Sequence, residues 1–147
     1  MIKKIDHINI VVKDLEKAKQ FFFDLGFICK ADHAELLEGH WVDQLTGLKK
    51  VKAFYYALTL PGSQTSLELL MYVNPEGISD PLISNPNHIG FRHMAFEVED
   101  IEVFVSQLKK KKVKFFSGIQ EYKQTGKKLC YFYGPEGNIL EAAEYTR

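Results

Sequence analysis

The chain has 147 residues, of which 46% are hydrophobic and 26% are charged, and its 19 basic side chains balance its 19 acidic ones. This length and composition are typical of one globular domain that buries a core without disulfides or a structural metal. Zero net charge argues against a nucleic-acid-binding protein, which needs a basic excess to release phosphate counterions. No apolar run approaches 18 residues, so we expect no helix that spans a membrane and no membrane partner. We also expect no secretion signal, because the apolar run near the N-terminus is short and interrupted by Asp6, His7 and Asn9.

The two cysteines, Cys29 and Cys130, lie far apart in the sequence among apolar or aromatic neighbours. Such usage is typical of reduced thiols rather than of a disulfide framework. We therefore expect a cytoplasmic protein with two buried thiols.

The first half of the chain predicts a strand, a helix and three further strands. Asp14 can accept hydrogen bonds from the N–H groups of a first helical turn, and Gly26 supplies a stop, so we expect a helix over 14–25. The stretches VKAFYYALTLP and SLELLMY, on either side of a Pro-Gly turn, have the composition of strands.

The second half repeats this pattern. FRHMAFEVEDIEVFVSQL aligns without gaps with IDHINIVVKDLEKAKQFF, so that His93 matches His7 and Asp100 matches Asp14. Apolar residues follow Asp100 at helical spacing and predict a helix over 100–111: Ile101, Phe104, Val105 and Leu108. We predict an α+β domain of two βαβββ modules, about 1–75 and about 88–147.

The first module carries about 13 more residues than the second, because 61 residues separate His7 from Glu68 and 48 separate His93 from Glu141. The insertion falls around GHWVDQLTGL, where Trp41, Leu45 and Leu48 recur at helix-like spacing. Two interpretations stay open for it, a lid over a binding site or a loop packed on the sheet edge.

In both modules, the alternation of side chains along a strand places the candidate polar residues on the face away from the helix. Successive side chains of a strand point to opposite faces, so His7 and Asn9 lie opposite the apolar set Ile8, Ile10 and Val12. By the same rule Glu68 and Tyr72 share one face of their strand, and His93 and Glu141 lie away from the helix-packed faces of theirs.

Two imidazoles and two carboxylates that converge would repel and lose hydration unless a cation lay between them. We therefore predict one divalent metal ion held by His7, Glu68, His93 and Glu141. Nitrogen and oxygen ligands suit Zn, Ni, Co, Mn or Fe, and ligand softness does not choose among these metals. Asn9 and Tyr72 are candidates for a substrate pocket.

This arrangement resembles the vicinal oxygen chelate superfamily, which contains glyoxalase I, methylmalonyl-CoA epimerase, extradiol dioxygenases, fosfomycin-resistance enzymes and bleomycin-resistance proteins. The resemblance spans nearly the whole chain and rests on HINIVVKDLEKAKQFF, SLELLMY, FRHMAFEVEDIEVFVSQL and YGPEGNILEAAEY. It implies two βαβββ modules that form a curved, open mixed sheet with a metal-binding cleft. It also implies a homodimer, whose modules pair within one chain or between two.

The His, Glu, His, Glu set is similar to that of glyoxalase I and the epimerase. This resemblance implies a metal-dependent lyase or isomerase that removes a proton next to a carbonyl of a small substrate, with Glu68 or Glu141 as the base. Val11 stands where glyoxalase I usually has an arginine for glutathione, so glutathione fits poorly. The alternatives are an extradiol-type dioxygenase or resistance transferase, and a non-catalytic binding protein of the bleomycin-resistance kind.

Overall fold

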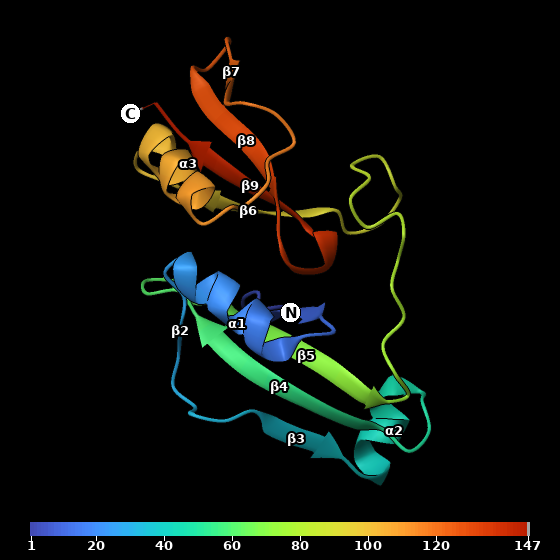
Figure 1. Cartoon of the computed structure of the whole chain (residues 1–147). Helices are drawn as coiled ribbons and strands as arrows, with labels where there is room; N and C mark the ends of the chain where they lie inside the picture. Colours follow the sequence, from blue (N-terminus) through green and yellow to red (C-terminus); the bar gives the residue numbers. More distant parts are fainter. Residues whose placement is uncertain (147) are drawn as a thin grey trace. The chain divides into compact units, whose positions relative to one another are not determined.

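Two units of similar local architecture make up the chain, Met1–Ser79 and Asp80–Arg147. Their structure is a computed structural model that describes residues 1–146. They are named unit 1 and unit 2 in chain order (Figure 1).

Unit 1 is a five-stranded mixed sheet with two helices. Its elements are β1 (His7–Val11), α1 (Leu15–Asp24), β2 (Ile28–Cys29), β3 (Glu35–Glu38), α2 (His40–Thr46), β4 (Lys52–Thr59) and β5 (Ser66–Asn74). The strand order is β1-β5-β4-β2, with β3 also paired to β4. The β1 strand runs parallel to β5, and the other pairs are antiparallel.

Unit 2 is a four-stranded mixed sheet with one long helix. Its elements are β6 (His93–Glu97), α3 (Ile101–Lys110), β7 (Gln120–Tyr122), β8 (Lys127–Tyr133), the short 3-10 helix η1 (Pro135–Gly137) and β9 (Ile139–Glu144). The strand order is β6-β9-β8-β7, with β6 parallel to β9. The predicted α+β class and the βαβββ pattern are confirmed. In unit 1 the edge strand is interrupted, because β2 and β3 pair with opposite ends of β4.

Both predicted helices are confirmed, and both begin in the same way. The Oδ1 atom of Asp14 accepts a hydrogen bond from the backbone N–H of Lys17 at 2.9 Å, and Oδ1 of Asp100 accepts one from Val103 at 2.9 Å. Each aspartate has extended backbone angles, as an N-cap residue does. The capping carboxylate therefore determines where each helix starts.

The two helices also end on the same backbone motif, although only the first has a glycine there. After α1, Gly26 has φ +97° and its N–H donates to Phe23, while the N–H of Phe27 donates to Phe22. The rings of Phe22 and Phe27 pack edge to face at 5.4 Å, the apolar contact that accompanies this cap. After α3, Lys112 occupies the left-handed position with φ +62°.

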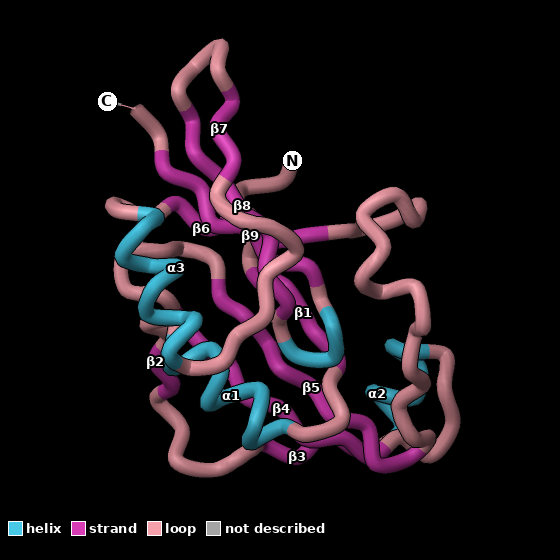
Figure 2. The backbone as a smooth tube through the Cα atoms, turned by 45° about the horizontal axis from the view of Figure 1, so that its top comes forward, coloured by secondary structure: helices cyan, strands magenta, loops and turns pink. Residues whose placement is uncertain are grey.

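One face of each sheet packs against its long helix and forms the core of the unit, as Figure 2 shows for α1. The helix-facing residues of unit 1 are buried: Ile10, Val12, Leu15, Ala18, Phe22, Leu67 and Leu69. Those of unit 2 are buried too: Ile101, Val105, Leu108, Cys130, Phe132, Leu140 and Ala142. We call the opposite face, with His7, Asn9 and Glu68 in unit 1 and His93 and Glu141 in unit 2, the site face of that unit.

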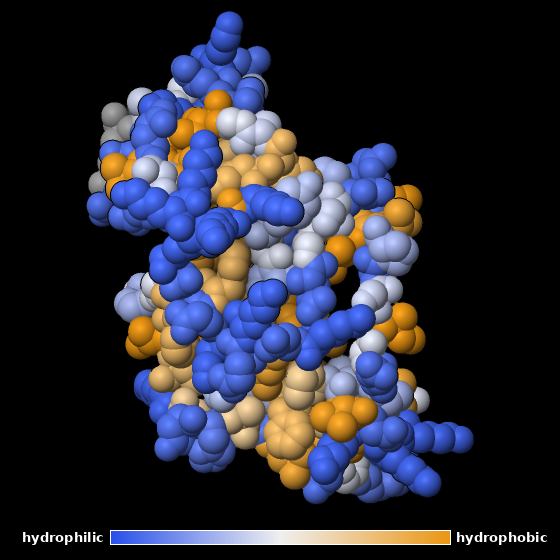
Figure 3. Space-filling model, viewed as in Figure 1, coloured by the Kyte–Doolittle hydropathy of each residue, from blue (hydrophilic) through white to orange (hydrophobic). Residues whose placement is uncertain are grey.

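The side of the molecule drawn in Figure 3 is mainly hydrophilic, with apolar residues scattered among polar ones. Among residues 1–146, none of the helices is both long enough and apolar enough to cross a membrane. Both thiols are free, but only Cys130 is buried, because Cys29 lies half exposed on the short edge strand β2.

Candidate functional site

The parallel pair of β1 and β5 brings His7 and Glu68 together in unit 1. The pairing places Ser66 opposite His7 and Glu68 opposite Asn9, so all four side chains share the site face. His7 Nε2 lies 3.5 Å from Glu68 Oε2, and 31% of the Glu68 side chain is exposed. A nitrogen and an oxygen donor thus stand side by side, both accessible to solvent.

The second ring nitrogen of His7 has a partner of its own. Nδ1 lies 2.9 Å from Asp6 Oδ2, and this hydrogen bond, followed by the charge of Glu68, raises the pKa of His7 above its usual value. The same contact lowers the pKa of Asp6. Histidines that bind metals commonly donate their other N–H to a carboxylate, which fixes the ring and directs the free nitrogen to the ion. The local arrangement therefore fits a metal ligand.

Unit 2 builds an equivalent pair with the strands β6 and β9. Glu141 lies opposite Ala95, two residues after His93, just as Glu68 lies opposite Asn9. His93 Nε2 is 3.2 Å from Glu141 Oε2, and the His93 ring lies 5.1 Å from that of Tyr131. Only 6% of the Glu141 side chain is exposed, so this carboxylate is far more buried than that of Glu68.

A cation that the sequence analysis missed compensates the buried carboxylate. Lys127 Nζ lies 3.3 Å from Glu141 Oε1 and 5.0 Å from the centre of the Tyr145 ring. Its hydrogen bond to Tyr145, and then its bond and attraction to Glu141, raise the pKa of Lys127. The antiparallel pairing of β8 with β9 places Lys127 and Tyr131 on the Glu141 face, so the parity rule could have found both.

The two pocket candidates of unit 1 have different surroundings. Asn9 is exposed beside Glu68. Tyr72 is half-buried and packs against an apolar cluster on the site face, which consists of Val42, Val51, Ala53 and Leu70. Asn9 is therefore open to a small molecule, whereas Tyr72 also forms part of the packing beneath α2.

A tyrosine on β4 also belongs to the site face of unit 1. The hydroxyl of Tyr55 donates to Glu35 Oε2 at 2.7 Å. This hydrogen bond is the main cause that raises the pKa of Tyr55 to about 12, with burial and the charges of Glu35 and Glu68 adding to it. At neutral pH Tyr55 is thus a firmly protonated hydrogen-bond donor.

The inserted segment forms the helix α2, and its buried residue is not one of the three that recur at helix-like spacing. In α2 the buried residue is Val42, which packs on the apolar cluster. The three residues whose spacing predicted this helix, Trp41, Leu45 and Leu48, are 59%, 75% and 40% exposed. Whether these residues cover a binding site stays a prediction, because the helix itself is held on unit 1 through Val42.

Each unit by itself brings together one histidine and one glutamate of the predicted set. Within residues 1–146, no cluster of three or more His, Cys, Asp or Glu side chains is positioned to hold a metal ion. The local geometry consists of two similar donor pairs, one of which carries an additional ammonium group.

Comparison with known proteins identifies the family. The family model described as "Glyoxalase/Bleomycin resistance protein/Dioxygenase superfamily" matches residues 4–142. The chain belongs to this superfamily. Its members often bind a divalent metal ion.

Similar proteins match over nearly their full length. The chain is 30% identical to the uncharacterized protein YaeR of Escherichia coli, with 97% of each chain covered, and 29% identical to the uncharacterized protein YwkD of Bacillus subtilis, with 98% covered. It is also similar to the crystal structure of a glyoxalase family protein from Bacillus cereus, with 28% identity, a TM-score of 0.89 and coverage of 100% of this chain and 97% of that one. These matches support the superfamily assignment and its fold.

Proposed function

We propose that the protein is a metal-dependent enzyme of the glyoxalase or epimerase type, which removes a proton next to a carbonyl group of a small oxygenated substrate. One observation supports this most directly: a histidine Nε2 lies within 3.5 Å of a glutamate carboxylate at equivalent positions of both repeats. His7, Glu68, His93 and Glu141 would hold the ion, which is Zn, Ni, Co, Mn or Fe. When bound, the ion supplies a Lewis acid that stabilises negative charge on the substrate oxygen.

We assign the role of general base to Glu68. A base must leave its resting contacts to reach a substrate proton, and within residues 1–146 the carboxylate of Glu68 pairs with one ionisable group, His7, at 3.5 Å. The residue opposite Glu68 on β4 is the exposed Ala57, whose small side chain leaves room above the carboxylate. Glu141 is held at both oxygens, by His93 and by Lys127, and so it suits a fixed ligand.

The test begins with a screen of 2-oxoaldehyde hemithioacetals and acyl-CoA thioesters for metal-dependent isomerisation. With a substrate found, exchange of its α-proton with deuterated solvent is followed in the wild type and in Glu68→Gln. Glutamine keeps an oxygen donor of similar shape but is not a base, so exchange should fall by about 10²- to 10⁴-fold, while metal content stays unchanged.

Two further variants make this experiment decisive. Glu141→Gln also keeps an oxygen donor, so it should leave metal content unchanged and lower exchange less than Glu68→Gln does. Glu97→Gln should change neither quantity, because Glu97 is an exposed glutamate on the site face of β6. Wild-type exchange in Glu68→Gln at full metal occupancy would overturn the base assignment. Oxygen consumption by the wild type would overturn the reaction class in favour of a dioxygenase.

A second candidate function is non-catalytic binding of a small molecule. It is favoured by the buried pair of Glu141 and Lys127, in which the carboxylate already has a cationic partner. Purification without chelators separates the two functions. Protein that contains no divalent metal, and binds none when it is added, would favour the binding function.

We also propose that the protein acts as a homodimer, in keeping with its family resemblance. Light scattering during size-exclusion chromatography should give a particle of twice the 16.9 kDa chain mass. A particle of 16.9 kDa at all concentrations would contradict this.

A further inference from the structure

A pocket of about 450 Å³ opens on the site face of unit 2, over β7 and β8. Its walls are mainly aromatic and apolar, and a lysine reaches into it; they include Phe116, Tyr122, Leu129, Tyr131 and Lys127. The strand pairing places Tyr131 opposite Glu141, and Tyr122 opposite Lys127. The pocket therefore adjoins the His93 and Glu141 pair.

The aromatic wall is fixed by its own packing. The ring of Phe116 stacks on Tyr133 at 4.2 Å and meets Tyr131 edge to face at 5.8 Å. The backbone N–H of Phe116 also donates to the carbonyl of Tyr131 at 3.0 Å. A wall tied to β8 by these contacts presents a preformed surface to a flat or apolar group.

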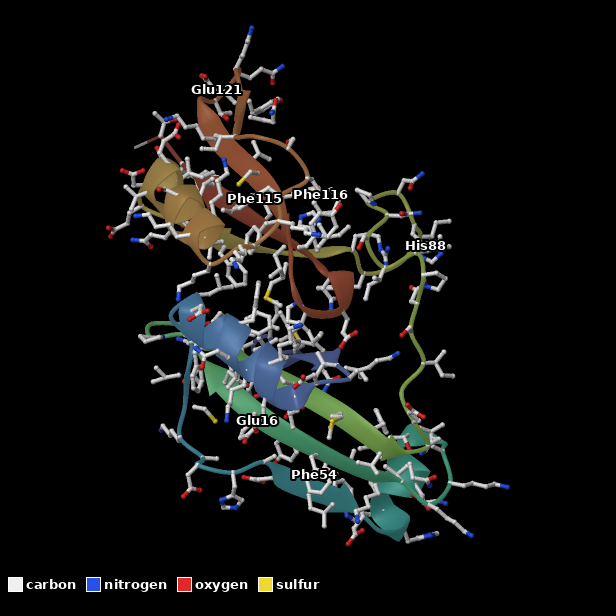
Figure 4. All side chains as sticks on the ribbon, in the orientation of Figure 1. Glu16, Phe54, His88, Phe115, Phe116 and Glu121 are labelled. Atoms are coloured by element: carbon white, nitrogen blue, oxygen red, sulfur yellow. The ribbon has the colours of Figure 1, made fainter. Side chains whose placement is uncertain are left out.

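Lys127 supplies the one cation among the residues that line this pocket. Its ammonium group contacts Glu141 Oε1 and lies over the Tyr145 ring, and 26% of its side chain is exposed. An ammonium group carries three N–H donors, so these contacts leave donor capacity toward a ligand. The acidic lining residue, Glu121, is exposed to solvent toward the outer tip of the β7–β8 hairpin (Figure 4), where water and salt screen its charge.

We propose that this pocket binds the carboxylate end of a substrate with a flat apolar body, and that Lys127 recognises the carboxylate. The inference deepens the proposed function and rests on it for the link to turnover. It narrows the substrate class to carboxylates with an aromatic or similarly flat apolar group.

The experiment compares two probes of nearly the same shape, phenylacetate and its neutral analogue phenylacetamide. Each is titrated into ¹⁵N-labelled, metal-free protein, and backbone amide shifts give both the site and the dissociation constant. Phenylacetate should shift amides of residues 116–122 and 127–131 and should bind at least about tenfold more tightly than the amide, since a charge-assisted hydrogen bond is lost with the latter.

Three variants identify the residue responsible. Lys127→Met keeps the aliphatic stem and should abolish the preference for phenylacetate, while Lys127→Arg should retain it. Lys128→Met is the matched control, because Lys128 is the next residue of β8 and points to the opposite face. The amide spectrum of each variant also reports whether it is folded.

Equal binding of the two probes to the wild type, or a preference that survives in folded Lys127→Met, would overturn the inference. Shifts confined to other parts of the chain would overturn it as well. These outcomes are independent of metal content and α-proton exchange, so failure of this inference and failure of the proposed function are distinguishable.

Discussion

Glu68 and Glu141 occupy equivalent positions on β5 and β9, yet the second is buried and the first is accessible. The neighbouring strand explains the difference. Opposite Glu68 lies Ala57, whereas opposite Glu141 lies the much larger Tyr131. Four residues before Ala57 on β4 stands Ala53, and four residues before Tyr131 on β8 stands Lys127. The repeat has thus kept its donor pairs while the residues around them have diverged.

The helix-facing sides of the two units, by contrast, remain alike. Phe22 of α1 and Leu108 of α3 hold the same repeat position and are 0% and 2% exposed. Phe22→Ala should lower the free energy of unfolding by about 3–5 kcal/mol and Leu108→Ala by about 2–5 kcal/mol, because each leaves a cavity. Urea unfolding measures both. The exposed Val103 of α3 provides a control, and Val103→Ala should change stability by less than about 0.5 kcal/mol.

Lys127 has no counterpart on the site face of unit 1, and its loss should lower the stability of the protein. In metal-free protein, Lys127→Met leaves the buried Glu141 carboxylate without its cation, and the free energy of unfolding should fall by about 1–3 kcal/mol. Lys128→Met, on the opposite face of β8, should have little effect. If the two variants are equally stable, the carboxylate of Glu141 does not depend on Lys127.

Substitutions at the ends of α1 and α3 should change stability by smaller amounts and in opposite directions. A left-handed conformation costs most residues more than it costs glycine, so Gly26→Ala should destabilise the protein by about 1 kcal/mol, and Lys112→Gly should stabilise it by about 0.5–1 kcal/mol. Thermal unfolding of both variants measures these changes. Changes of the same sign in the two variants would contradict the shared cap.

Tyr55 gives the site face of unit 1 a titration step that has no counterpart in unit 2. At the equivalent position of β8, unit 2 has Leu129. The raised pKa of Tyr55, about 12, means that the folded protein holds this proton more tightly than the unfolded chain. The resulting stability is present below the ordinary tyrosine pKa of about 10 and is lost as the pH rises toward 12. Phenolate absorbance should show a tyrosine that titrates late, and Glu35→Gln should shift that step to lower pH. A titration curve unchanged in that variant would contradict the assignment.

Much of the local fold follows from sequence signals that are themselves local. Asp14 and Asp100 predict the helix starts, and the apolar spacing after them predicts the buried faces, because both signals act within a few turns of chain. The buried residue of α2 could not be predicted in this way, because packing against distant strands selects Val42 rather than the residues at helix-like spacing, Trp41, Leu45 and Leu48.

In the candidate site, too, some residues could be predicted from the sequence and others depend on contacts between distant strands. His7, Glu68, His93 and Glu141 were found because the repeat duplicates them. Lys127 and Tyr131 were missed because their counterparts, Ala53 and Ala57, have no matching chemistry. Their place on the face of Glu141 depends on strand register, which a repeat comparison does not examine.

We propose that one divalent ion binds His7, Glu68, His93 and Glu141. Metal analysis of protein purified without chelators, combined with titration of the chelator-treated protein, tests it most directly. We expect one ion per chain in the wild type, and reduced content in both His7→Ala and His93→Ala, with the surface variant His33→Ala unchanged. Full metal content in both His7→Ala and His93→Ala would show that the ion lies elsewhere and would contradict the account.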